Sequence, residues 1–370
     1  PLRLQIGEYE LREIGAPDGY ILTGYEGKMK EGTYKEQPKE PVKFKVKMNT
    51  AYYEDPETKE IIINVEQYND EMFGELEITK TGEYLQGAET RKDGTIDPIY
   101  QKRQIEGAEF EIYAKEDIYT IDNQGTKLCE KDQLVKKITT NAQGKAYIDN
   151  LPIGKYYIKE VKTVEGFVLN KEPKEFEVSY QGEKTAVQKI EISYKNERQK
   201  INLNGNEENG ETGIIKKDQE TGEKLEGAII GIYSKEDITG ENGIIIPKDT
   251  LIEKVITDKN GKAKYTIDLP LGKYYLKEIQ APIGYILNEQ TIEIDGSYKG
   301  QEIEQININQ TIENKSRTVQ IEKIDQEGNP LKGAKLEIIE ETRQIDTWET
   351  TEQAHEIRKL EAGKTYILKE

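Results

Sequence analysis

Hydrophobic and polar residues alternate with a period of two along most of the chain, in short runs rich in Ile, Val, Tyr and Thr. Gly, Asn, Asp and Pro separate these runs, and no apolar pattern of helical period continues for more than a turn or two. Such alternation is typical of strands that place one face on a core and the other in water. The pattern therefore predicts an all-β protein, a set of sandwiches built from many short antiparallel strands.

One strand motif, Gly-x-Tyr-x-(Leu/Ile)-x-Glu, recurs along the chain and ends at Glu13, Glu160 and Glu278. A variant with one more residue after the glycine ends at Glu370. The interval between copies is far longer than a solenoid unit, so each copy should be a domain with its own core. We divide the chain into four repeats, of which the two middle ones are complete and the outer two are parts: repeat 1 (residues 1–72), repeat 2 (73–198), repeat 3 (199–315) and repeat 4 (316–370).

The segments between repeats predict how the domains are joined. Residues 202–212 are polar, rich in Gly and Asn and without periodicity, as in a linker. The boundaries near 70–73 and 315–317 are short, which predicts domains arranged end to end as a rod. Repeat 2 also carries an insertion near 89–106, which we interpret as a surface loop or extra hairpin, or alternatively as a loop that contacts a ligand.

A lysine, a glutamate and an asparagine each end a row of apolar residues that should face the core. Lys80, for example, shares a strand face with Leu76 and Ile78. The interval from Glu to Asn is 36 residues in both complete repeats. The full sets are Lys80, Glu160 and Asn196 in repeat 2, and Lys216, Glu278 and Asn314 in repeat 3; partial sets are Glu13 with Asn69, and Lys323 with Glu370.

These residue types in one core point to a covalent reaction. Burial without a partner costs several kcal/mol for a charged group, lowers the pKa of a lysine and raises that of a glutamate. A neutral amine is a nucleophile, and a protonated carboxyl group can polarise the Asn carbonyl and carry protons while ammonia leaves. The product is a Lys–Asn isopeptide bond. The alternative is a buried Lys–Glu ion pair with Asn as a hydrogen-bond partner.

Charge and composition argue against several other kinds of partner and site. The net charge is −18, which disfavours nucleic acid and anionic membranes as partners. The single cysteine, Cys129, cannot form an internal disulfide, and the single histidine, His355, lies in another repeat. His355 and Trp348 are expected in a loop. We expect no metal site and no cofactor, because one His and one Cys are too few for a zinc site and the sequence has no EF-hand loop.

The motifs resemble a known family. Lys-x-Asp…Leu-x-Gly-Ala (residues 216–229 and 323–336) with Gly-Lys-Tyr-Tyr-x-x-Lys-Glu…Ala-Pro-x-Gly-Tyr (272–285, and in part 7–20) is similar to the Cna protein B-type, SpaA-like, prealbumin-like repeats of Gram-positive surface proteins. Repeat 2 departs from the pattern, with Gly82 in place of the Asp and Phe167 in place of the Tyr. The resemblance implies tandem immunoglobulin-like, prealbumin-like β-sandwiches with intramolecular isopeptide bonds.

The resemblance also implies an extracellular stalk or spacer, anchored to the cell wall by a sortase. Its partners would be neighbouring domains of the chain, peptidoglycan, and host extracellular-matrix proteins bound through regions outside this segment. No membrane insertion is expected in this segment. The alternative function is direct binding of host matrix of the collagen or fibrinogen type, through a sandwich edge or through residues 91–104. Catalysis on an external substrate is disfavoured because the inward carboxylates come one per repeat, whereas a glycosidase needs a close pair.

Overall fold

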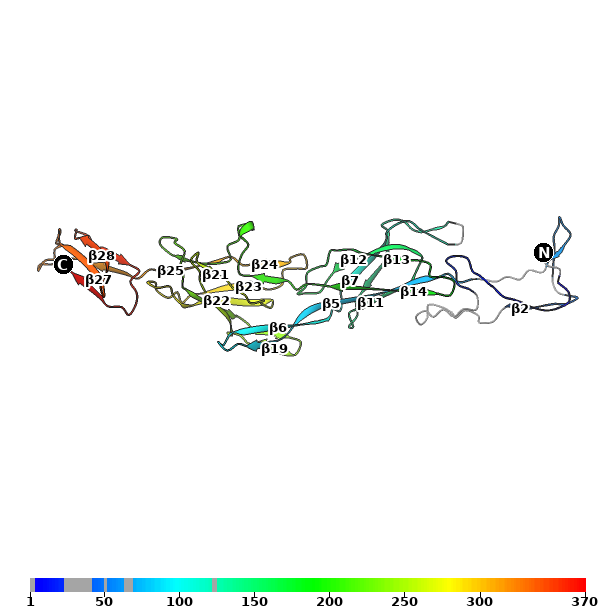
Figure 1. Ribbon diagram of the computed structural model, residues 1–370, viewed down its shortest axis with the longest axis horizontal. Coiled ribbons are helices and arrows are strands. Elements are labelled where there is room, and N and C mark those ends of the chain that lie inside the picture. The colour runs from blue at the N-terminus through cyan, green and yellow to red at the C-terminus, as the bar shows by residue number, and fades with distance from the viewer. Residues whose placement is uncertain (1–3, 23–41, 50–51, 63–68, 122–124) are drawn as a thin grey trace. The chain divides into compact units, whose positions relative to one another are not determined.

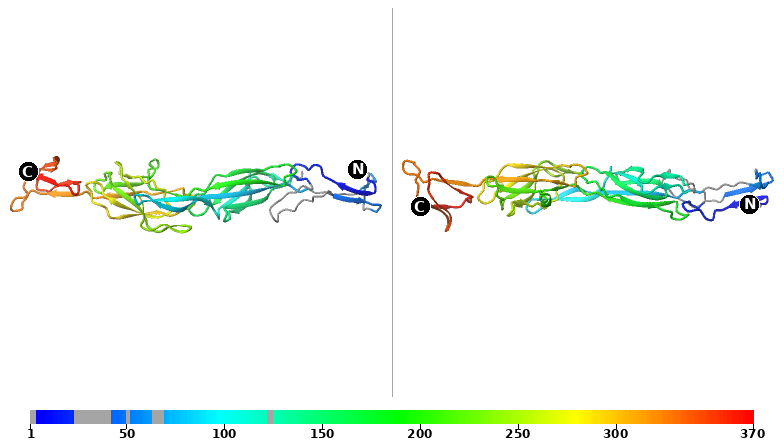
Figure 2. Two further views of the ribbon diagram at one scale, coloured as in Figure 1. Left: turned by 60° about the horizontal axis from the view of Figure 1, so that its bottom comes forward. Right: turned by 90° about the horizontal axis from the view of Figure 1, so that it is seen from above.

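The computed structural model describes residues 4–22, 42–49, 52–62, 69–121 and 125–370. Their regular structure is extended strand, apart from one 3-10 turn, η1 (Glu207–Asn209). The views of Figures 1 and 2 show these strands joined by loops, and the all-β prediction is confirmed. Within the described ranges, no helix has the length and apolarity to cross a membrane.

Packing divides the described residues into two compact units. The first contains the described residues up to Gly82 together with Lys102–Glu197. The second contains Glu83–Gln101 together with Arg198–Glu370. Residues 89–101 of the insertion therefore belong to the second unit, and residues 102–106 belong to the first.

Repeat 2 folds as a sandwich of two sheets with strand orders β10-β7-β12-β13 and β11-β5-β14, and Figure 1 labels β5, β7, β11, β12, β13 and β14 of this sandwich. The two sheets share a core, because Tyr194 packs on Phe110 with 4.9 Å between ring centroids. The strands are β5 (Phe73–Thr90), β6 (Ile96–Gln104), β7 (Glu109–Ala114), β8 (Ile118–Tyr119), β9 (Lys127–Cys129), β10 (Leu134–Thr139), β11 (Lys145–Leu151), β12 (Gly154–Lys162), β13 (Lys174–Val178) and β14 (Val187–Lys195).

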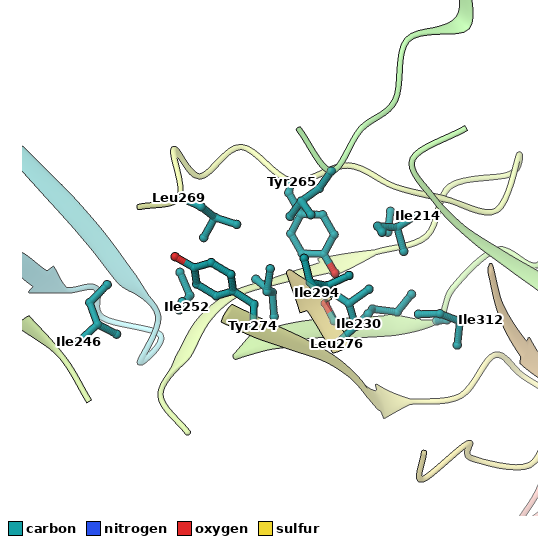
Figure 3. Close-up of a cluster of buried hydrophobic side chains, with 14 of the residues drawn as sticks. Ile214, Ile230, Ile246, Ile252, Tyr265, Leu269, Tyr274, Leu276, Ile294 and Ile312 are labelled. Carbon is teal, nitrogen blue, oxygen red and sulfur yellow. Dashed lines mark hydrogen bonds between the residues drawn. The ribbon is translucent and has the colours of Figure 1, made fainter. Parts of the chain in front are cut away.

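Repeat 3 has the same design, with sheets β20-β17-β22-β23 and β21-β16-β25. Its core takes side chains from both sheets, among them Ile214, Ile230, Leu276 and Ile312 (Figure 3). The strands are β15 (Lys200–Asn202), β16 (Ile214–Asp218), β17 (Ile229–Ser234), β18 (Ile238–Gly240), β19 (Gly243–Ile246), β20 (Leu251–Ile256), β21 (Lys262–Ala263), β22 (Gly272–Gln280), β23 (Thr291–Gly296), β24 (Gln305–Asn307) and β25 (Gln310–Asn314).

In each complete sandwich the strand that carries the lysine lies beside the last strand, in parallel. β14 pairs with β5 so that Tyr194 is opposite Lys80, and β25 pairs with β16 so that Asn314 is opposite Asp218. In repeat 3 the short β15 also pairs in parallel with β24, so among the described residues three parallel pairs accompany the antiparallel strands that the sequence predicts. Parallel neighbours require a long crossover connection, and here the whole remainder of the domain supplies it.

The strands of repeats 1 and 4 have fewer partners among the described residues. Consequently Leu11 and Val319, which alternation predicts to face a core, are 39% and 42% exposed. β1 pairs with β2, β3 with β4, β26 with β29, and β27 with both β28 and β30. Their bounds are β1 (Gly7–Leu11), β2 (Val42–Val46), β3 (Tyr53–Glu54), β4 (Ile61–Ile62), β26 (Thr318–Ile321), β27 (Lys335–Glu340), β28 (Arg343–Glu349), β29 (His355–Arg358) and β30 (Tyr366–Lys369).

The insertion of repeat 2 is a hairpin formed by the end of β5 and by β6. Its residues Leu85, Ala88 and Ile96 pack against the core of repeat 3. Tyr100 donates a hydrogen bond from its hydroxyl to the Asp268 carbonyl, at 3.0 Å. The hairpin therefore completes the apolar packing of the second compact unit.

Candidate functional site

In repeat 2 the expected lysine, glutamate and asparagine come together inside the sandwich. β5 supplies Lys80, β12 supplies Glu160, and Asn196 follows β14 directly. Alternate residues of β5 are buried as far as Gly82, as the period of two predicts. The side chains of Lys80 and Glu160 are 0% exposed, and Asn196 is 1% exposed. The three functional groups are therefore shielded from water.

The contacts within this set link all three groups. Lys80 Nζ lies 2.9 Å from Glu160 Oε1 and donates a short hydrogen bond to Asn196 Oδ1. Asn196 Nδ2 donates to Glu160 Oε1 at 3.0 Å and to the Thr163 hydroxyl at 2.7 Å. The amine nitrogen is thus directed at the carboxamide group, with the carboxyl group in contact with both.

Repeat 3 brings its set together with slightly different contacts. Lys216 Nζ is 3.0 Å from Glu278 Oε1, and both side chains are 0% exposed. Asn314 Nδ2 donates to Glu278 Oε2 at 2.8 Å and to the Ile286 carbonyl at 2.6 Å. Asn314 Oδ1 is buried and makes no hydrogen bond, whereas the buried Lys216 Nζ and Glu278 Oε1 pair with each other as ions. A buried polar atom without a partner is costly, and these three atoms are the amine, the acid and the carbonyl of the expected reaction.

Burial lowers the pKa of both lysines, because desolvation disfavours the ammonium form. Glu160 and Glu278 oppose this shift by attracting the charge. The remaining influences differ in sign: Lys174 lowers the pKa of Lys80 further, whereas Glu313 raises that of Lys216. A larger share of each amine is therefore neutral at a given pH than in an exposed lysine.

A backbone amide donates a hydrogen bond to each glutamate and holds it in place. The alternation of apolar residues along the strands did not predict this contact. Asn170 N donates to Glu160 Oε2 at 2.8 Å, and Asn288 N donates to Glu278 Oε2 at 2.7 Å. The Asn288 side chain also donates to the Glu313 carbonyl, at 2.9 Å. The shared pattern Gly-(Phe/Tyr)-x-Leu-Asn at 166–170 and 284–288 is the sequence signal for this contact.

The two departures of repeat 2 from the family pattern occupy one place in the fold. In repeat 3 the Tyr285 hydroxyl donates to Asp218 Oδ2 at 2.9 Å. In repeat 2 the same place holds Gly82 against Phe167, where an added Cβ would lie 2.3 Å from the ring. Loss of the carboxylate and loss of the hydroxyl thus compensate each other, and the loop beside the site keeps its position.

The partial sets also come together as far as their members allow. Glu13 accepts two hydrogen bonds from Asn69 Nδ2, at 2.7 and 2.9 Å. Lys323 Nζ donates to Glu370 Oε2 at 2.7 Å, with side chains 34% and 56% exposed. Neither pair is enclosed as tightly as the complete sets.

The other residues singled out from the sequence form no reactive cluster. Burial raises the pKa of the Cys129 thiol, which disfavours the thiolate. His355 stacks on Trp348 and pairs with Asp346 at 2.8 Å, on strands rather than in the loop that was expected. The described residues contain no group of three or more His, Cys, Asp and Glu able to hold a metal ion.

Two sandwiches in tandem, each with its lysine strand parallel to its last strand and with a buried Lys, Glu and Asn set, define a class of repeated β domain. The chain belongs to the SpaA family of prealbumin-like fold domains, whose model matches residues 94–193, 210–311 and 317–370. The resemblance drawn from the motifs is thereby confirmed. The three matches fall in repeats 2, 3 and 4.

Similar proteins come from Gram-positive bacteria. The trypsin-resistant surface T6 protein of Streptococcus pyogenes serotype M6 is 39% identical over 74 residues, which are 20% of this chain and 11% of that protein. The Bacillus anthracis TIE protein is 28% identical, with 81% of this chain and 46% of that chain covered and a TM-score of 0.47. A streptococcal ancillary pilin is 17% identical, with 85% and 76% covered and a TM-score of 0.25. The chain thus spans about a tenth of the T6 protein and less than half of the TIE protein.

Proposed function

We propose that this chain is a stalk or spacer segment of a bacterial surface adhesin or pilin-like protein, and that its complete repeats crosslink themselves. Lys80 joins Asn196, and Lys216 joins Asn314, each with the help of the buried glutamate. The supporting observation is that both repeats hold amine, carboxyl and carboxamide groups in contact and out of water.

The proposed reaction starts from these contacts. The neutral amine attacks the Asn side-chain carbon, while the carboxyl group, which contacts both the amine and the Asn nitrogen, transfers a proton from the amine to the departing nitrogen. The fold supplies the high effective concentration that amide exchange needs. One ammonia leaves per repeat, and the product is neutral, so the cost of burying an ammonium group disappears. Each bond forms once within one molecule, which is not enzymatic turnover.

Intact-mass spectrometry of the full chain tests the proposal. We expect the mass to fall short of the sequence mass by two ammonia molecules. Glu160→Ala or Glu278→Ala should each restore one of them, because the proton carrier of that repeat is lost. Lys217→Ala is the matched control, since it removes the lysine next to Lys216 and should leave the deficit unchanged. A wild-type chain of unmodified mass would leave only the ion-pair interpretation.

The proposed location is the outside of a Gram-positive cell, with attachment to peptidoglycan by a sortase through regions outside this segment. Membership in the SpaA family and the likeness to a streptococcal surface protein support this location. The partners proposed within the segment are neighbouring domains of the same chain.

The alternative function is direct binding of host matrix proteins through residues 91–104. The aromatic side chain of this segment, Tyr100, is already engaged by Asp268 and by Arg198, whose guanidinium carbon lies 3.3 Å from the ring centroid. No observation favours the alternative over the stalk. Saturable binding to immobilised matrix proteins that disappears when residues 91–104 are deleted would support it.

A further inference from the structure

Thr163 is a polar side chain of the repeat 2 site that the expected set does not include. It follows the last residue of β12 and is 6% exposed. Asn196 Nδ2 donates one hydrogen bond to Thr163 Oγ1 at 2.7 Å and another to Glu160 Oε1 at 3.0 Å. Both N–H groups of the Asn196 side-chain amide are thereby hydrogen-bonded. The carboxamide group is held with its oxygen toward Lys80.

The corresponding acceptor in repeats 1 and 3 is a backbone carbonyl. Asn69 Nδ2 donates to the Ile21 carbonyl at 2.9 Å, and Asn314 Nδ2 donates to the Ile286 carbonyl at 2.6 Å. Three residues after the glutamate, where repeat 2 has Thr163, these repeats have alanines: Ala16 and Ala281. A carbonyl oxygen can only accept a hydrogen bond, whereas a hydroxyl group can accept and donate. Repeat 2 therefore differs from the others in what faces the Asn nitrogen.

We propose that Thr163 is a fourth functional residue of the repeat 2 site, whose hydroxyl oxygen holds the leaving nitrogen of Asn196 by accepting one of its hydrogens. This inference rests on the proposed crosslinking reaction. In that reaction the Lys80 nitrogen bonds to the Asn196 side-chain carbon, and the bond from that carbon to Nδ2 breaks. One hydrogen passes from the lysine nitrogen through Glu160 to Nδ2, which leaves as ammonia.

Thr163 accepts one hydrogen of the Asn196 nitrogen before and during this step. Before attack the amide nitrogen is planar, and when the carbon becomes tetrahedral the nitrogen becomes pyramidal and presents one lone pair. The hydrogen bond to Thr163 Oγ1 holds the nitrogen so that this lone pair can take the hydrogen from Glu160. In repeat 3 the Ile286 carbonyl accepts the corresponding hydrogen bond.

Pulsed synthesis of the full chain in vitro tests the role of Thr163. Samples are quenched in denaturant at intervals, and crosslinked peptides of repeats 2 and 3 are quantified by mass spectrometry. We expect Thr163→Val to slow the repeat 2 crosslink about tenfold, the effect of losing one hydrogen bond in the transition state. Thr163→Ser should keep a rate close to that of wild type. The repeat 3 crosslink in the same molecules is the internal control and should be unchanged.

The possible results distinguish failure of the Thr163 proposal from failure of the crosslinking proposal on which it rests. If neither wild-type repeat ever loses ammonia, the crosslinking proposal itself fails. If both crosslinks form and Thr163→Val or Thr163→Ala is as fast as wild type, Thr163 has no role in the reaction. A Ser variant as slow as the Val variant would also overturn the inference, because the methyl group rather than the hydroxyl group would then matter. Trypsin resistance of repeat 2, measured on portions taken before the denaturant is added, distinguishes slow reaction from failure to fold.

Discussion

Lys80 and Lys216 have the same role in the proposal but different charged neighbours. Lys174 disfavours the ammonium form of Lys80, whereas Glu313 favours that of Lys216. The amine reacts only when neutral, so the rate of crosslinking should rise with pH through the lowered pKa and level off above it. Both profiles are therefore expected at lower pH than the titration of an exposed lysine, with the two neighbouring charges acting on them in opposite directions.

Substitution of the neighbouring charges tests this difference. Lys174→Gln removes a like charge, raises the pKa of Lys80 and should move the repeat 2 rate profile to higher pH. Glu313→Gln removes an opposite charge and should move the repeat 3 profile to lower pH. Pulsed synthesis over a range of pH provides both profiles from one chain. Identical profiles that neither substitution moves would contradict the prediction.

At the scale of single residues, the sequence could predict some members of the site and not others. Lys80, Glu160 and Asn196 end rows of period two, and that period fixes which face of a strand a side chain occupies. Thr163 and Asn170 lie outside the strands, where no period assigns a direction. Their contacts depend on the path of the loop after β12, which only the folded chain defines.

At the scale of elements, the contact between Gly82 and Phe167 predicts that position 82 of β5 tolerates no side chain larger than that of glycine. Gly82→Asp would bring a side chain against the Phe167 ring and Ile105, with a Cβ contact of 2.3 Å. Overpacking of this kind should destabilise repeat 2 by about 1–3 kcal/mol. Denaturant unfolding in the Glu160→Ala background provides the measurement, since no crosslink then masks the change.

Gly87 is the matched control for this prediction. It lies on the same strand, and an added Cβ there meets no atom within 4 Å. Gly87→Asp should therefore cost much less stability than Gly82→Asp. Adding Phe167→Tyr to Gly82→Asp restores the pair seen in repeat 3 and should recover part of the loss. Equal effects of the two glycine substitutions would show that contact with Phe167 is unimportant.

Alternation along β5, β12 and β14 could be predicted from the sequence, because each of these strands has one face on the core. The parallel pairing of β5 with β14 could not, since it joins segments more than a hundred positions apart and leaves no local signal. The rows of β1 and β26 were predicted to be inward and are partly exposed, because periodicity does not report how many neighbours a strand has.

At the scale of the whole molecule, the hairpin at Glu83–Gln101 predicts that stability crosses the repeat boundary. Tyr100→Ala removes a hydrogen bond to Asp268 and a stacked contact with Arg198. We expect repeat 3 to lose about 1–3 kcal/mol of stability, while repeat 2 is little affected. Hydrogen exchange of β17 and β22 compared with β7 and β12 measures the two repeats separately.

Ile99→Ala is the control for the hairpin, because Ile99 is adjacent in β6 and 39% exposed. It should leave exchange in both repeats near wild type. Protection lost equally from repeats 2 and 3 in Tyr100→Ala would count against a specific contribution of the hairpin to repeat 3. The sequence indicated an insertion here, but alternation alone does not say which core a strand joins.

The parallel register of β5 and β14 determines what a covalent bond at Lys80 and Asn196 would do under tension. The chain enters repeat 2 at one end of this strand pair and leaves at the other, so a force applied along the chain shears β5 against β14. A bond across the pair would carry that load directly from one strand to the other. The 116 positions separating Lys80 from Asn196 would be excluded from the extensible length, roughly 400 Å of contour at full extension.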